Sequence, residues 1–175
     1  MEWFKRCSFV QIARGMEVST HSFVVLPGAS RTQGARGLGG EISLKVSGKD
    51  TVGVWAFFEI PTSPHAGPPL HFHHKQDEWF YVLKGDHHFR IGSDDYLVHA
   101  GGSIFGPRMI PHAWQNISEE QENLLVLVQP AGQLEEFFME FSELGSKALA
   151  SGVAVRELFA KYEMQVVGSP LSDPA

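Results

Sequence analysis

The most informative stretch of the sequence lies between residues 67 and 85. It reads Gly-Pro-Pro-Leu-His-Phe-His-His-Lys-Gln-Asp-Glu-Trp-Phe-Tyr-Val-Leu-Lys-Gly. Alternate side chains of a β-strand point to the same face, so His71 and His73 are expected to point inward together. Glu78 opens the next strand in phase with Phe80 and Val82. A carboxylate that enters the core among apolar neighbours needs a compensating partner, and a metal cation held by two imidazoles supplies one.

A third histidine, His112, follows in a glycine- and proline-containing stretch from Gly101 to Asn116. Three imidazoles and one carboxylate form a donor set that suits Fe, Mn, Ni, Cu, Co or Zn, with open positions for water or a substrate. We therefore predict a site for one divalent transition metal. The donor set does not select among these metals.

Both stretches resemble the motifs of the cupin superfamily. The first motif, H-x-H-x(3,4)-E-x(6)-G, is matched by His71, His73, Glu78 and Gly85, with four residues in the spacer. The second is matched in spacing by Gly101, Pro107, His112 and Asn116. Met109 stands where the family usually has a glycine, and Gly67 lies four residues before the first histidine instead of six. The resemblance implies a double-stranded β-helix, a jelly-roll barrel, with His71, His73, Glu78 and His112 as metal ligands. Within the superfamily, the sequence around the first motif is similar to that of small bacterial quercetin-dioxygenase-like proteins with one cupin domain.

Short strands separated by glycine and proline turns also favour an all-β barrel over about residues 41–130. A first strand is expected at 22–26 and another at 52–60, and the glycine-rich stretch 29–40 is expected to be a loop. Apolar residues at helical spacing, beginning with Leu134 and Val155, predict two helices within about 132–163. The last eight residues are expected to form a loose tail. We expect residues 1–175 to form a single domain.

An apolar and aromatic pocket is expected beside the metal. Its predicted lining is Phe80, Val82, Phe89, Phe105, Met109 and Trp114. Such residues suit a flat substrate, but they are equally what any barrel core contains. His74 is expected to point away from the ligands, and His87 to point into the barrel as a packed histidine.

The amino-acid composition limits which partners and which cellular location we expect. The net charge of −6 and the scattered Arg and Lys residues argue against a nucleic-acid partner. The single cysteine, Cys7, rules out an intramolecular disulfide. No apolar run approaches the length of a membrane span, and the first residues lack a signal-peptide core, so a cytoplasmic location is expected. Trp79, Tyr81 and Leu83 form an apolar series opposite Glu78. This face is expected to form a homodimer interface, the alternative being that the N-terminal strands and the C-terminal helices cover it.

The first functional hypothesis is a metal-dependent oxidoreductase that reacts a small enolic or aromatic substrate with dioxygen. Glu78 is the candidate catalytic base for the substrate hydroxyl. A second hypothesis is a binding or sensor module for a metal or small ligand, without turnover. A third is an isomerase or decarboxylase, which predicts a cationic pocket in which Arg108 is the basic residue nearest the site.

Overall fold

Buried and more exposed side chains alternate along the strands, because each strand turns one face to the interior of the molecule. A computed structural model describes residues 22–31, 35–37, 40–144, 149 and 152–172. The strands are β1 (Arg36–Gly37), β2 (Gly40–Glu41), β3 (Ser43–Val46), β4 (Ala56–Thr62), β5 (Pro69–His73), β6 (Asp77–Lys84), β7 (Asp86–Ile91), β8 (Asp94–His99), β9 (Ser103–Gly106), β10 (His112–Asn116), β11 (Glu122–Gln129) and β12 (Met164–Pro170). The helices are α1 (Leu134–Glu143) and α3 (Val153–Lys161).

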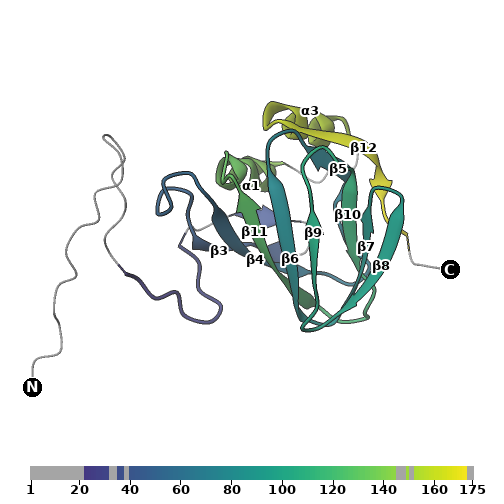
Figure 1. The fold of residues 1–175 in the computed structure, drawn as a ribbon, viewed down its shortest axis with the longest axis horizontal. Helices are drawn as coiled ribbons and strands as arrows, with labels where there is room; N and C mark the ends of the chain where they lie inside the picture. Colours follow the sequence, from purple (N-terminus) through teal and green to yellow (C-terminus); the bar gives the residue numbers. More distant parts are fainter. Residues whose placement is uncertain (1–21, 32–34, 38–39, 145–148, 150–151, 173–175) are drawn as a thin grey trace, which may run out of the picture.

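Two antiparallel sheets face each other (Figure 1). One has the order β12-β5-β10-β7-β8 and the other the order β3-β4-β11-β6-β9, while β1 and β2 form a small separate pair. Neighbours in both sheets are mostly distant in sequence, as in a jelly roll. The predicted all-β barrel with two C-terminal helices is therefore confirmed.

The space between the sheets is filled by the inward residues of each strand. Strands β4 and β11 alternate strictly between buried and partly buried positions over most of their length. Phe58, Phe80, Phe89 and Val126 are at most 2% exposed. Burial of such side chains is the main contribution that stabilises the two-sheet packing.

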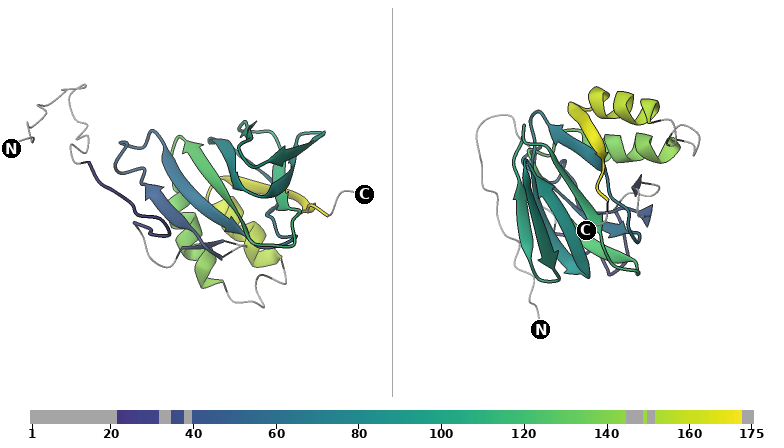
Figure 2. Two further views of the ribbon diagram at one scale, coloured as in Figure 1. Left: turned by 90° about the horizontal axis from the view of Figure 1, so that it is seen from below. Right: turned by 90° about the vertical axis from the view of Figure 1, so that its right-hand side faces the viewer.

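The C-terminal segment packs across one end of the barrel (Figure 2). Helix α1 buries Leu134, Phe137 and Phe141, and α3 buries Leu158 and Phe159. Strand β12 then pairs with β5, with Val166 opposite His71. Both helices are as predicted. The loose tail is wrong in part, because residues 168–170 belong to β12 and complete the sheet that carries three of the predicted ligands.

Three further expectations need correction. Residues 22–26 form no strand, because they pair with no strand of the described residues and Val24 is 84% exposed. The strand predicted at 52–60 begins only at Ala56, since a turn closed by the Gly53 amide and the Gly48 carbonyl occupies the preceding residues. The loop predicted at 29–40 contains β1 and the start of β2, while residues 32–34 and 38–39 lie outside the described residues.

The apolar series opposite Glu78 lies on the outer face of its sheet. Trp79 is 36% and Leu83 46% exposed, and Trp79 lies directly opposite Phe105 of β9. Pairing of two copies through this face stays a prediction. Within the described residues, no helix is long and apolar enough to cross a membrane.

Candidate metal centre

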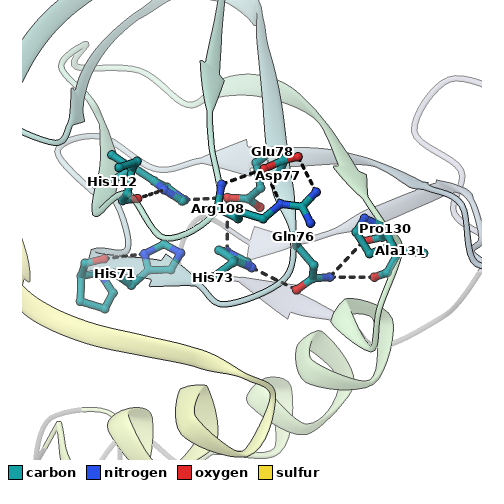
Figure 3. A network of polar contacts seen from close by, with 11 residues as sticks. His71, His73, Gln76, Asp77, Glu78, Arg108, His112, Pro130 and Ala131 are labelled. Carbon is teal, nitrogen blue, oxygen red and sulfur yellow. Dashed lines mark hydrogen bonds and ion pairs between the residues drawn. The ribbon is translucent and has the colours of Figure 1, made fainter.

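Three neighbouring parts of the barrel bring the predicted ligands together (Figure 3). His71 and His73 point inward from β5, with 7% and 1% exposed, while His74 between β5 and β6 is exposed. His112 begins β10 and lies directly opposite His71 in the antiparallel ladder. Glu78 enters from β6 of the other sheet and is 7% exposed. The cluster therefore lies between the two sheets.

The distances within this cluster fit one metal ion. One ligand atom from each of the four residues lies within 4.8 Å of the others. Glu78 Oε2 is 2.9 Å from His112 Nε2 and 3.4 Å from His73 Nε2. Atoms that each lie about 2.1 Å from one metal are roughly 3.0 to 3.4 Å apart at right or tetrahedral angles. The two separations from Glu78 are close to that range, while the four ligand atoms as a set lie within 4.8 Å.

In each of the three clustered histidines, Nδ1 lies within hydrogen-bond distance of an acceptor. Nδ1 of His71 lies 2.8 Å from the Pro69 carbonyl, and Nδ1 of His112 lies 3.0 Å from the Ile110 carbonyl. A carbonyl oxygen only accepts, so both Nδ1 atoms carry the proton. The Nε2 lone pairs are then free to point at a metal, which is the arrangement of metal-binding histidines.

His73 is held by a residue that the motif does not include. Its Nδ1 lies 3.1 Å from Gln76 Oε1, while Gln76 Nε2 donates to the Ala131 carbonyl at 2.9 Å. The carbonyl fixes the amide orientation, so the Gln76 oxygen must face His73 (Figure 3). Gln76 falls in the variable spacer before Glu78, and neither periodicity nor the motif marks it.

The charges of the cluster favour the metal-binding protonation state at Glu78 and His71, whereas at His73 they favour the protonated ring. Burial lowers the pKa of His71 to about 3, and His112 and His73 contribute to this lowering. Burial alone would raise the pKa of Glu78, but His73 and His112 hold it well below its usual range. Burial opposes a charge on His73, yet Glu78 raises the pKa of His73. An ionised Glu78 and a neutral His71 are ligand forms.

The cluster opens into a cavity of about 350 Å³. Phe80 and Trp114 line it, as predicted, together with aromatic residues of the two helices: Phe137, Phe138, Phe141 and Phe159. Val82 and Phe89 are buried in the barrel and do not line the cavity. Phe105 and Met109 are 54% and 53% exposed and do not line it either. The predicted lining is therefore corrected at these four positions.

Met109 has an unusual backbone conformation, with φ at 65°. Its amide donates to the His73 carbonyl at 2.8 Å, which ties this loop to β5. A non-glycine residue is strained in this left-handed conformation, whereas glycine adopts it freely. We expect Met109→Gly to raise the free energy of unfolding by about 0.5–1 kcal/mol, measured by urea denaturation. Met109→Ala keeps the strain and should show no gain; equal stabilities of the two variants would contradict this interpretation.

Two facing antiparallel sheets with a buried His3Glu cluster between them match the jelly-roll barrel that the two motifs predicted. Residues 58–128 match the family model described as Cupin domain. That region contains all four cluster residues. Residues 58–128 therefore carry a cupin domain, as the two motifs predicted.

Three solved structures match about half of this chain. TT1209 from Thermus thermophilus is 26% identical, with a TM-score of 0.43, covering 45% of this chain and 75% of that one. KdgF from Halomonas sp. is 15% identical, with a TM-score of 0.46 and coverage of 51% and 76%. A predicted oxalate decarboxylase from Thermotoga maritima is 21% identical, with a TM-score of 0.49 and coverage of 51% and 79%. No curated protein matches the sequence.

Proposed function

We propose that this chain binds one divalent transition metal through His71, His73, Glu78 and His112, and that it oxidises a small enolic or aromatic substrate with dioxygen, as quercetin-dioxygenase-like cupins do. The observation that carries the proposal is the position of the cluster, because His71, His73 and Glu78 line a cavity that is also lined by aromatic side chains. A flat apolar molecule in this cavity has its edge at the ligands.

The bound metal would supply Lewis-acid polarisation of a substrate oxygen and redox chemistry at the inner end of the cavity. Glu78 is the group that accepts the proton of the substrate hydroxyl, because its carboxylate faces the same space and favours the ionised form. Phe80, Trp114 and Phe159 all line the cavity. These side chains exclude water and hold the substrate ring in one plane.

Phe159 also supports a ligand directly. Its ring packs edge-on against the His71 imidazole, with centroids 5.1 Å apart, and against Phe137, with centroids 5.0 Å apart. Helix α3, which contributes Phe159 to the cavity lining, is therefore in contact with the proposed metal ligand His71.

The other two hypotheses receive different support. A binding or sensor module without turnover needs the same cluster and cavity, so activity measurements must separate it from an oxidoreductase. The isomerase or decarboxylase hypothesis predicts a cationic pocket with Arg108 as the basic residue nearest the site. Arg108 instead makes two side-chain hydrogen bonds to Asp77, at 3.0 and 2.6 Å, and does not line the cavity.

The test begins with elemental analysis of the purified protein beside a His112→Ala variant prepared identically. We expect close to one metal per chain in the wild type and none in the variant. The loaded protein is then mixed with quercetin and catechol while oxygen consumption is recorded. Oxygen uptake that His112→Ala lacks supports the proposal. Stoichiometric metal with no oxygen uptake would favour the binding module, and no metal even after reconstitution would overturn the proposed site.

A further inference from the structure

One basic residue belongs to the wall of the cavity. Arg156 lies in the first half of α3, between Val155, which lines the cavity, and Glu157. Its side chain is largely exposed, so the guanidinium lies where the cavity meets solvent. Among the described lining residues outside the metal cluster, it is the one that carries a charge.

The Arg156 guanidinium is available to a ligand. Within the part of the chain that the structure describes, it makes no side-chain hydrogen bond or ion pair. Arg90 and Arg108, by contrast, each pair with an aspartate through two nitrogen atoms. No residue three or four positions from Arg156 on the helix is acidic, so α3 offers it no partner.

The rest of the cavity wall is apolar. Ser169 and the Trp114 indole are the polar groups among the described lining residues other than the cluster and Arg156. A hydroxyl-rich ligand would leave its hydroxyl groups without partners in this space, and each unpaired buried group is costly. Aromatic rings and aliphatic side chains favour an aromatic or branched aliphatic body instead.

We infer that the ligand of this cavity is an amphipathic organic carboxylate, whose apolar body lies among Phe137, Phe141 and Phe159 and whose carboxylate pairs with Arg156 at the mouth. The inference rests on the proposed function in taking this cavity as the substrate site. Arginine presents a planar fork of donors that matches a carboxylate with two parallel hydrogen bonds. Arg156 is therefore a specificity-determining residue, which selects the charge of the substrate.

The test compares 2-naphthoate with its neutral analogue 2-naphthamide. Binding of each is measured by calorimetry to protein freed of metal with a chelator, so that a metal cannot attract the carboxylate. We expect the wild type to prefer 2-naphthoate by about tenfold, as for a charge-assisted hydrogen-bonded pair. The preference should shrink as salt is raised, because the guanidinium is near solvent.

Arg156→Gln should abolish the preference while leaving the affinity for 2-naphthamide unchanged, which also shows that the cavity is intact. Arg108→Gln is the matched control, because it removes an arginine that does not line the cavity, and it should keep the wild-type preference. The inference is overturned if Arg156→Gln keeps the preference, if the wild type shows none, or if neither compound binds. Since no metal is present and no oxygen is consumed, these outcomes are independent of the proposed oxidation.

Discussion

Replacing Gln76 by leucine is expected to weaken metal binding about ten- to a hundredfold although no ligand is removed. The expected loss is that found when a hydrogen-bond partner of a metal-binding histidine is deleted. Gln76 Oε1 accepts from His73 Nδ1, and its amide nitrogen donates to the Ala131 carbonyl. Leucine removes the acceptor, so the His73 ring loses both its orientation and the proton placement that frees Nε2.

Affinity is measured by competition between the protein and a chromophoric chelator for zinc, which carries no redox chemistry of its own. Urea unfolding of the metal-free protein is measured alongside, because leucine also leaves the buried Ala131 carbonyl without its donor. A loss of stability without a loss of zinc affinity would mean that Gln76 holds the chain segments together but does not orient the ligand.

Gln76→Glu is the informative companion variant. A carboxylate still accepts from His73 Nδ1, so the zinc affinity should remain close to that of the wild type. Its second oxygen cannot donate to Ala131, so the stability should fall as in Gln76→Leu. Equal zinc affinities for the two variants would contradict a role of the acceptor.

The clustering of the four predicted ligands could be foreseen from the sequence because it depends on local rules. His71 and His73 share a face through strand alternation, and the spacing to Glu78 and His112 is preserved in the motifs. Gln76 could not be found in this way. Its role requires residues 130–131 to lie beside the spacer between β5 and β6, and that contact joins residues 55 positions apart in sequence.

The pocket was the least predictable part of the site, for two physical reasons. Gly106 lies opposite Glu78 in the ladder between β9 and β6, so Phe105 falls opposite Trp79 on the outer face. A one-residue difference in register reverses every side chain of a strand, and sequence alone did not settle it. The cavity is also closed by α1 and α3, whose apolar faces were predicted without a docking position.

Strand β12 is another element that the sequence alone did not predict. Its sequence, Met-Gln-Val-Val-Gly-Ser-Pro, contains a glycine and a proline, which weaken a strand prediction. The strand forms because β5 offers an edge on which Met164 lies opposite His73. Pairing with an existing sheet, rather than intrinsic propensity, therefore decides this element.

Acid is expected to destabilise the fold strongly through His87, which lies away from the metal ligands along β7. Its side chain is 0% exposed, Nε2 is 3.0 Å from Thr62 Oγ1, and no described group contacts Nδ1 by a hydrogen bond. Burial lowers the pKa of His87 to about 4, although the neighbouring Asp86 opposes this effect. A proton on the ring would place a charge in the core without a partner.

The direction of the pH dependence follows from the pKa values of the two states. The unfolded chain takes up a proton near pH 6.5 and the folded chain only near pH 4, so the contribution of His87 is complete above pH 6.5 and is lost as the pH falls towards 4. This difference corresponds to roughly 3 kcal/mol at pH 4. His87→Gln cannot be protonated in this range, and it should lack that part of the acid sensitivity.

Urea unfolding of the metal-free protein at pH 7 and about pH 4.5 measures the effect for wild type, His87→Gln and His74→Gln. The wild type should lose about 2.5 kcal/mol more stability between these pH values than His87→Gln. The exposed His74 is the matched control, and His74→Gln should behave as the wild type. The contribution of His71, whose pKa is also lowered by burial, is common to all three proteins and cancels in the comparison. If His87→Gln loses as much stability in acid as the wild type, the buried His87 ring is not the group that limits the fold at low pH.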